Sequence, residues 1–159
     1  MVSKSTSQAV GFTLIELVAI IMVIAVLSIM VLPKFSGRTG LAEYALRDQL
    51  IALARHAQQR AMFDHSGACY RLLIQASGAQ VQRDGLLFDA QSSIAFSGDY
   101  NGLSATSAAL YFDAFGNVLT GGSDCASSSI PASALSIAIS GGNPVSLLIH
   151  PTGYVQRQG

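Results

Sequence analysis

The sequence predicts an α+β protein in which one long N-terminal helix packs on a head of antiparallel β-strands. An uninterrupted apolar run occupies residues 12–32, and an amphipathic helical pattern follows it over residues 34–63. Short β-rich runs separated by turn signals then fill residues 64–159. Helix followed by a succession of short strands is the element order of an α+β domain.

The apolar run is the most distinctive part of the chain. Its 21 residues include only three polar ones, Thr13, Glu16 and Ser28. As a helix it would be about 31 Å long, which matches the hydrocarbon core of a bilayer. Lys4 is the only charge before the run, which favours a cytoplasmic N-terminus. We therefore expect a single-pass membrane protein with residues 34–159 outside the cytoplasm.

Helical periodicity resumes after a predicted break. Pro33 directly follows the apolar run, and Gly37 and Gly40 weaken the helix further. We expect one long helix over residues 12–63, with a kink or melted turn near residues 33–40. Its second half carries one apolar stripe, formed by Ala42, Leu46, Leu50, Leu53, Ala57 and Ala61.

Eight β-rich runs, bounded by glycine, asparagine and proline turns, predict an antiparallel sheet that covers this stripe. The first two form a hairpin around Ser77-Gly78, and the Gly/Ser-rich stretch 120–129 is expected to be an exposed loop. The runs are residues 69–75, 79–83, 93–97, 109–113, 118–120, 135–140, 145–150 and 154–156.

The chain has two cysteines, Cys69 and Cys125. In an oxidising compartment such a pair forms one disulfide, which would close a loop of roughly 56 residues and stabilise the fold by about 4 kcal/mol. The alternative is two buried free thiols. Neither cysteine has a second cysteine or a histidine at ligand spacing, so a metal site is not expected.

The N-terminal motif points to a known family. Residues Gly11-Phe-Thr-Leu-Ile-Glu16, with the apolar run and Pro33 behind them, resemble the class III signal of type IV pilins and type II secretion pseudopilins. The resemblance implies a leader over residues 1–11, a transmembrane and filament-core helix over 12–33, an amphipathic helix over 34–63 and a pilin-like periplasmic head over 64–159.

The same resemblance implies a processing and assembly route. A prepilin peptidase would cut between Gly11 and Phe12 and methylate the new amine of Phe12. The subunit would first lie in the inner membrane, and an inner-membrane assembly platform would then transfer it into a pilus or pseudopilus filament. Its partners would be the peptidase, the platform, the membrane, and other pilin or pseudopilin subunits.

Glu16 is expected to pair charges in that filament. A carboxylate inside an apolar helix costs roughly 2.5–3.5 kcal/mol on insertion scales, which marks it as a functional candidate. The resemblance implies that Glu16 pairs with the Phe12 amine of an adjacent subunit, and such a pair would fix register more than add stability. The alternative is a plain signal-anchor in which Glu16 reaches the lipid headgroups.

The second half of the chain narrows the family. Residues 45–61 resemble the helix of the pseudopilin H type, and residues 112–118 and 149–155 resemble two glycine-turn motifs late in those heads. The helix, with Cys69 soon after it, looks most like a minor pilin of the mannose-sensitive haemagglutinin (MSHA) pilus. A minor pilin is therefore expected; a minor pseudopilin of a type II secretion system and a non-polymerising, anchored periplasmic binding module are the alternatives.

The charges are unevenly spread, although the formal net charge is zero. A basic stem under an acidic head would help neighbouring subunits set their stagger, and a solvated helix face beside an acidic surface is the alternative. Residues 34–63 hold Lys34, Arg38, Arg47, Arg55 and Arg60 against Glu43 and Asp48. Residues 64–159 hold Arg71, Arg83 and Arg157 against Asp64, Asp84, Asp89, Asp99, Asp113 and Asp124.

No motif for catalysis stands out, and we expect no enzyme and no cofactor. His56, His65 and His150 are scattered rather than set at metal-ligand spacing, and neither a nucleophile elbow nor a P-loop occurs. Asp124 is a weak calcium candidate because it lacks the spaced acids of a calcium loop. The acidic head offers no basic patch, so nucleic-acid binding is not expected.

Overall fold

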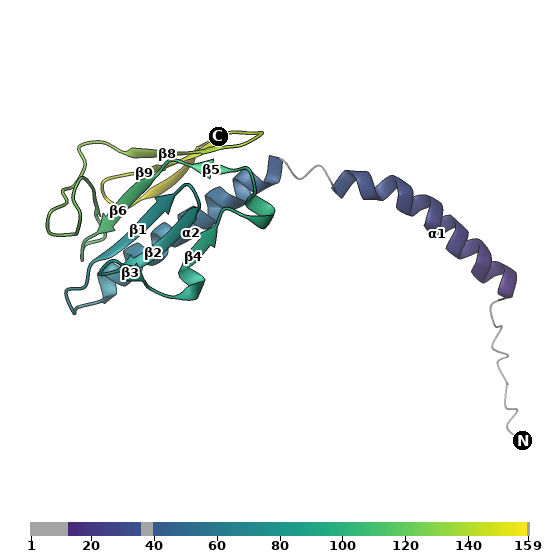
Figure 1. The fold of residues 1–159 in the computed structure, drawn as a ribbon, viewed down its shortest axis with the longest axis horizontal. Helices are drawn as coiled ribbons and strands as arrows, with labels where there is room; N and C mark the ends of the chain where they lie inside the picture. Colours follow the sequence, from purple (N-terminus) through teal and green to yellow (C-terminus); the bar gives the residue numbers. More distant parts are fainter. Residues whose placement is uncertain (1–12, 36–39, 159) are drawn as a thin grey trace, which may run out of the picture. The chain divides into compact units, whose positions relative to one another are not determined.

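The computed structural model describes residues 13–35 and 40–158, which belong to two units (Figure 1). The first unit contains helix α1 (Leu14–Phe35). The second contains helix α2 (Leu41–Phe63) and the β-strands. The single helix predicted over residues 12–63 is therefore two helices, and residues 36–39, where part of the predicted break falls, lie outside the described residues.

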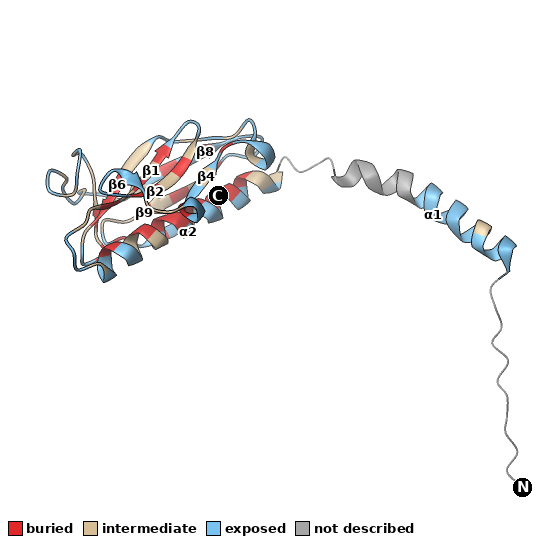
Figure 2. Cartoon of the chain, turned by 60° about the horizontal axis from the view of Figure 1, so that its bottom comes forward, coloured by how far each residue is buried: buried red, intermediate tan, exposed pale blue. Residues whose placement is uncertain are grey.

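Apolar side chains surround α1. From residue 14 to residue 27 its only charged residue is Glu16, and the other residues are apolar. All of these side chains are exposed except Val18, which is half-buried (Figure 2). Leu17 is 60% and Leu27 is 55% exposed. A helix that is apolar on every side normally has partners on every side.

The predicted localisation is wrong. A membrane-spanning helix needs about 20 predominantly apolar residues in sequence. No helix in residues 13–35 and 40–158 meets the length and hydropathy needed to cross a bilayer. We therefore correct the expectation of a single-pass inner-membrane protein with a periplasmic head.

The apolar stripe of α2 is buried, as the periodicity predicts, except at its first residue, Ala42, which is half-buried. Its charged residues mostly point away from the strands, and Figure 2 shows the buried stripe along the side of α2 that faces them. Two charged residues depart from this pattern, because Glu43 and Arg47 are buried as well. The buried apolar residues of α2 are Leu46, Leu50, Ile51, Leu53, Ala54, Ala57 and Ala61.

The eight predicted strand regions are all present, and the structure adds the short strands β3 and β5. All of the pairings are antiparallel, and α2 covers one side of both sheets. The strands are β1 (Tyr70–Gln75), β2 (Gly78–Arg83), β3 (Leu86–Leu87), β4 (Ser93–Ala95), β5 (Ser104–Ala105), β6 (Ala108–Phe112), β7 (Val118–Leu119), β8 (Leu135–Ser140), β9 (Val145–Ile149) and β10 (Val155–Gln158).

The strands form two sheets. The first has the order β3-β2-β1-β6-β7, with β4 also pairing with β2, and the second has the order β10-β9-β8-β5. The chain passes from the second sheet to the first between β5 and β6, within one nearly continuous extended segment. A hydrogen bond from Val118 N to Pro151 O, 2.8 Å long, joins the sheets again. The core lies between α2 and the sheets, where Leu72, Val81 and Ile149 are almost fully buried.

Candidate assembly site

The N-terminal site is described only in part. Gly11 and Phe12, the predicted cleavage and methylation positions, lie outside the described residues. Glu16 lies in the first turn of α1 with an exposed side chain. Its backbone N–H donates to the carbonyl of Thr13 over 3.1 Å and to the Thr13 hydroxyl over 3.3 Å. The Thr13 side chain therefore gives an N–H in the first turn of the helix a second acceptor, a capping role that the sequence reasoning missed.

The spacing of Thr13 and Glu16 matches that of a capping box, in which the acid reaches back to the N-terminal backbone. Within the described residues, Glu16 makes no ion pair. Its predicted partner, the Phe12 amine of another subunit, stays a prediction. Pro33 lies inside α1, which continues to Phe35, so the helix does not end at the proline.

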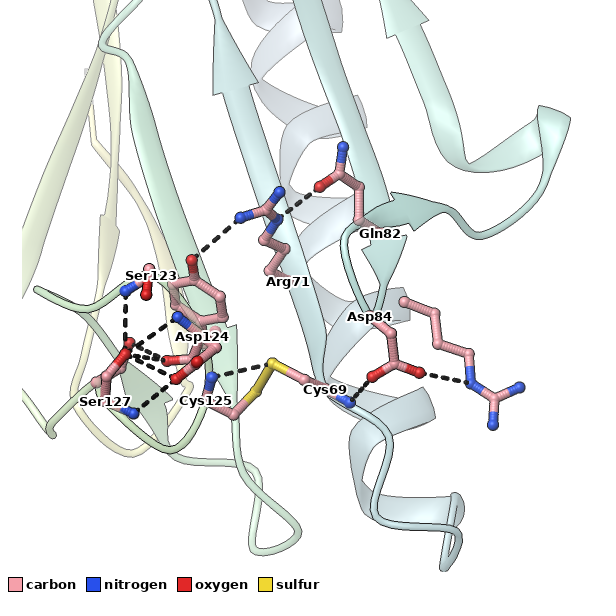
Figure 3. Close-up of a disulfide and its surroundings, with 11 residues drawn as sticks. Cys69, Arg71, Gln82, Asp84, Ser123, Asp124, Cys125 and Ser127 are labelled. Atoms are coloured by element: carbon pink, nitrogen blue, oxygen red, sulfur yellow. Dashed lines mark hydrogen bonds and ion pairs between the residues drawn. A yellow bond between two sulfur atoms is a disulfide. The ribbon is translucent and has the colours of Figure 1, made fainter.

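The predicted disulfide between Cys69 and Cys125 is present, with 5.7 Å between the two Cα atoms (Figure 3). It joins the residue before β1 to the Gly/Ser-rich loop after β7. The Asp84 carboxylate accepts a hydrogen bond from the Cys69 N–H over 2.8 Å, which holds the start of β1 in place. The disulfide thus fixes the loop beside the outer side of β1 and β6.

Asp124, the weak calcium candidate, binds its own loop. Its carboxylate accepts hydrogen bonds from the hydroxyl of Ser127 over 2.7 Å and from the Ser127 N–H over 2.8 Å. These bonds, the hydroxyl first, hold the pKa of Asp124 below its usual range. In residues 13–35 and 40–158, no cluster of three His, Cys, Asp or Glu residues has the arrangement of a metal site.

Arg71 is held on the outer side of the sheet near this loop. Its guanidinium donates to the Gln82 side chain over 2.5 Å and to the Tyr111 hydroxyl over 3.1 Å (Figure 3). Tyr111 is only 2% exposed. Arg71 and Tyr111 line a cavity of about 260 Å³ together with Cys69 and Asp124. The loop after β7 therefore lies over polar side chains on the outer side of the first sheet. The strand pattern of the sequence does not predict this arrangement.

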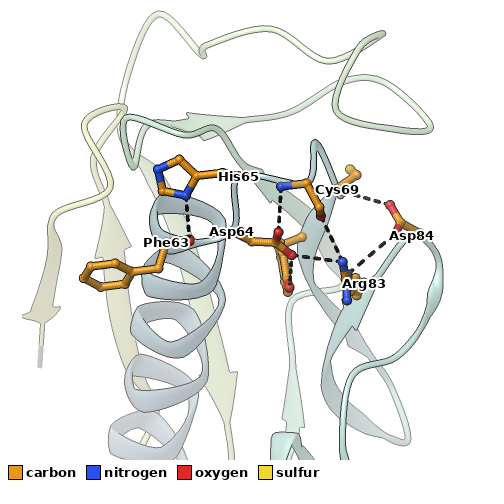
Figure 4. A network of polar contacts seen from close by, with 8 residues as sticks. Phe63, Asp64, His65, Cys69, Arg83 and Asp84 are labelled. Atoms are coloured by element: carbon orange, nitrogen blue, oxygen red, sulfur yellow. Dashed lines mark hydrogen bonds and ion pairs between the residues drawn. The ribbon is translucent and has the colours of Figure 1, made fainter.

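A polar network surrounds the end of α2 (Figure 4). The Asp64 carboxylate accepts hydrogen bonds from the Ser66 N–H over 2.9 Å and from the Tyr70 hydroxyl over 2.7 Å, and it lies 3.1 Å from Arg83 Nη2. Contacts with Ser66 and Tyr70, with the positive charge of Arg83, hold the pKa of Asp64 well below its usual range. Asp64 is thus an ionised anchor between α2 and the first sheet.

The two glycine-turn motifs meet at this end of α2. The Asp113 carboxylate accepts from the N–H groups of Phe115 and Asn117 over 2.9 and 2.8 Å, and Gln58 of α2 donates to Gly116 O over 2.8 Å. The turn is therefore fixed, yet it leaves the Phe115 ring 85% exposed. Tyr154, in the other motif, is 61% exposed. Sequence reasoning identified both motifs but not these displayed aromatic rings.

Glu43, which the sequence reasoning only counted among the charges of residues 34–63, does not lie on a solvated helix face. The side chain is fully buried, and its Oε1 accepts the Asn143 N–H over 3.1 Å. This backbone bond is the largest of the contacts that hold the pKa of Glu43 below its usual range. The turn between β8 and β9 lies so close that a side chain at Gly141 would collide with Glu43. Only the tertiary contact reveals this role.

Comparison of the chain with protein-family models, curated proteins and solved structures finds no match.

Proposed function

We propose that this chain is a filament subunit, a minor pilin that is incorporated into or primes a type IV pilus of the MSHA-like kind. The observation that carries the proposal is α1: over residues 14–27 this helix exposes apolar side chains on every side, with one acid in its first turn and the Gly11–Glu16 motif at its start. Fully burying one Leu or Ile side chain contributes about 1.5–3 kcal/mol. A bundle of such helices from neighbouring subunits provides that burial.

Glu16 has a defined role in this proposal. A carboxylate inside a dry helix bundle requires a positive partner, since an unpaired buried charge is strongly unfavourable. Cleavage between Gly11 and Phe12 creates an amine at the start of the same helix. The Phe12 amine of one subunit then pairs with Glu16 of the next and sets the axial register.

The α+β head, which from here on means α2 together with the strands (residues 40–158), supports the same proposal. Its disulfide and the Asp64 network fix a rigid body, and the turns bearing Phe115 and Tyr154 display aromatic rings suited to contacts with other subunits. A minor pseudopilin of a type II secretion system has the same requirements. Recovery in sheared surface filaments would favour the pilus, and dependence of secretion on the chain would favour the pseudopilus.

The first experiment is an intact-mass measurement on the protein from cells that carry its own prepilin peptidase. We expect a mature form that begins at N-methylated Phe12. Gly11→Val, which places a branched side chain at the cut, is the matched control and is expected to retain its leader. A full-length wild-type protein would overturn the proposal and favour a non-polymerising binding module.

A second experiment tests the charge pair. Glu16→Gln and Glu16→Ala are both expected to be processed normally and to enter filaments poorly, because each removes the negative charge. The readout is the amount of the chain in purified filaments relative to the amount of mature chain in the cell. Normal incorporation of Glu16→Gln would show that charge at this position is not needed.

A further inference from the structure

The Gly/Ser-rich loop after β7 is closed on itself. Thr120 and Ser129, which flank it, exchange backbone hydrogen bonds of 2.9 and 3.0 Å. Within the loop, the Asp124 carboxylate accepts the hydroxyl and the N–H of Ser127 over 2.7 and 2.8 Å. A surface loop whose ends meet and whose polar groups bind one another is an Ω-loop. Residues 121–128 therefore keep their shape largely through bonds of their own.

One pair of residues connects this loop to the sheet. In residues 40–158, the only hydrogen bond from residues 121–128 to a residue outside the loop runs from the Cys125 N–H to Cys69 Sγ over 3.1 Å. The same two residues form the disulfide. No residue of the loop is buried, and Ala126, its one aliphatic residue, is exposed. The disulfide is therefore the main connection that holds the loop against the first sheet.

Tyr111 of β6 is buried outside the core. Its neighbours Leu110 and Phe112 belong to the core, so the alternation of the strand turns Tyr111 to the outer side of the first sheet. The residue is nevertheless only 2% exposed. Tyr111 and its β1 neighbour Arg71 line one cavity with Asp124 of the loop (Figure 3). The loop therefore helps to keep Tyr111 from solvent.

Tyr70 is equally buried but for a different reason. It is also 2% exposed, and it belongs to the core cluster between α2 and the sheets. Its ring lies 5.7 Å from that of Phe88, and its hydroxyl donates to Asp64 at the end of α2. The exposure of Tyr70 therefore reports on the core, whereas that of Tyr111 reports on the outer side of the first sheet.

We propose that residues 121–128 are a redox-controlled cover: reduction of the disulfide between Cys69 and Cys125 releases them from the first sheet and exposes Tyr111, while the core stays folded. The reduced head then presents the Tyr111 ring together with the Arg71 guanidinium, a surface that the oxidised head keeps covered. This switch is a property of the head alone and does not rest on the proposed filament function.

The reductant is a dithiol. Both cysteines are half-buried and Cys69 lines the cavity, so a small thiol has access to them. A thiolate of the dithiol attacks one cysteine sulfur and forms a mixed disulfide, and the electron pair of the broken bond stays on the other cysteine. The second thiolate of the reductant then displaces the remaining cysteine. Two electrons and the two protons of the dithiol pass to Cys69 and Cys125, and the reductant leaves as a disulfide.

Side-chain labelling of the full-length chain tests the cover. One sample is reduced with dithiothreitol and its thiols are blocked with iodoacetamide, and a second sample stays oxidised. Both are exposed to hydroxyl radicals, and the labelled tyrosines are identified by mass spectrometry. On reduction we expect labelling of Tyr111 to rise by about fivefold or more and that of Tyr70 to stay unchanged, because the opening is local. Tyr154, which is 61% exposed, calibrates the radical dose.

Two results would overturn the proposal. Equal protection of Tyr111 in both samples would show that the loop keeps its place without the disulfide. A parallel rise at Tyr70 would show that the disulfide supports the whole head rather than a separate cover.

Two variants separate the disulfide from the internal structure of the loop. Cys69→Ser with Cys125→Ser removes the connection without a reductant, and its Tyr111 is expected to be labelled as strongly as in the reduced wild type. Ser127→Ala removes hydrogen bonds within the loop but keeps the disulfide, and its Tyr111 is expected to stay protected. Strong labelling of Tyr111 in oxidised Ser127→Ala would contradict the proposal, because the internal bonds would then be what holds the cover.

Discussion

α1 and α2 have nearly the same length, 22 and 23 residues, but they place their apolar side chains in opposite environments. Leu46 of α2 is fully buried, whereas Leu27 of α1 is 55% exposed. The buried apolar residues of α2 form one stripe, which the two sheets of the same unit cover. Those of α1 surround the helix, so no single surface can cover them. The distribution of apolar side chains around a helix therefore indicates whether the helix can be covered within its own unit.

The first acids of the two helices sharpen this comparison. Glu16 and Glu43 each occupy the first turn, where a negative charge favours the helix dipole. Glu16 is exposed, while Glu43 is fully buried and bound to the backbone of Asn143. Acids at the same helix position therefore have different environments. Glu43 is bonded to a turn of its own unit, and Glu16 is exposed.

Removing the disulfide is expected to have the largest effect on the head. Cys69→Ser with Cys125→Ser releases a loop closed over a sequence separation of 56 residues. The chain-entropy model predicts a loss of about 4 kcal/mol in the free energy of unfolding. Urea unfolding monitored by tyrosine fluorescence measures it, and reduced wild type is the control. Equal stability of the double variant and oxidised wild type would contradict the prediction. The helicity of α1 is expected to be unchanged.

Local patterns predicted much of this fold. The spacing of Leu46, Leu50 and Ala57 identified the buried stripe, and alternation with turn residues located the eight longer strand regions, because both signals depend on neighbours in sequence. The pairing of Cys69 with Cys125 followed from there being only two cysteines. The two-residue strands β3 and β5 escaped prediction because two residues carry no periodicity, whereas β7, equally short, was located by the Gly-Asn turn before it.

The missed features depend on contacts between distant residues. Nothing near Glu43 in the sequence indicates that the turn at Asn143 covers it, and nothing near Arg71 identifies Tyr111 as its partner. In the candidate site, too, some features are visible in the sequence and others are not. The Gly11–Glu16 motif is visible in the sequence, whereas the hydrogen bond from Gln58 of α2 to the turn at Gly116 appears only in the fold.

A leucine in each helix tests the comparison most directly. Leu50→Ala removes a side chain that is 1% exposed and is expected to lower the free energy of unfolding by about 3 kcal/mol. Leu17→Ala, at an exposed position of α1, is expected to change it by less than about 0.5 kcal/mol. Chemical denaturation gives both values. The filament-bound fraction is expected to fall for Leu17→Ala, and equal destabilisation of the head by both variants would contradict the distinction.

Glycine-to-alanine substitutions in two turns are expected to lower the free energy of unfolding by less than Leu50→Ala does. Gly153 has φ +79°, and a Cβ there would collide with Gly116 O, so Gly153→Ala is expected to cost about 2 kcal/mol. Gly85 has φ +84° with no atom near the added Cβ, and Gly85→Ala is expected to cost about 1 kcal/mol. Thermal unfolding compares the two. The reverse order would show that the Gly153 turn moves easily.

Lowering the pH is expected to reduce the stability of the head progressively. The folded-state pKa values of Glu43, Asp64, Asp89 and Asp124 are all lowered. A lowered pKa contributes stability above the unfolded value, about 3.9 for Asp and 4.3 for Glu, and this stability is lost as pH falls through that value toward the folded one. When denaturation midpoints are measured at pH 7, 5 and 3, we expect most of the decrease in the midpoint to occur below pH 5. Asp64→Asn should reduce this pH dependence, and an unchanged slope would show that Asp64 does not contribute.

Tyr70 gives the smallest expected effect, at the alkaline end. Burial first, and then its hydrogen bond to Asp64, raise the pKa of the Tyr70 hydroxyl in the folded head. A raised pKa contributes stability that is fully present below the unfolded value of about 10 and lost as pH rises through the folded value. The denaturation midpoint is therefore expected to decrease as the pH is raised above 10. Tyr70→Phe should make that decrease smaller. Because the phenol also donates to Asp64, the same substitution should weaken the acid dependence, a coupling that two independent groups would not show.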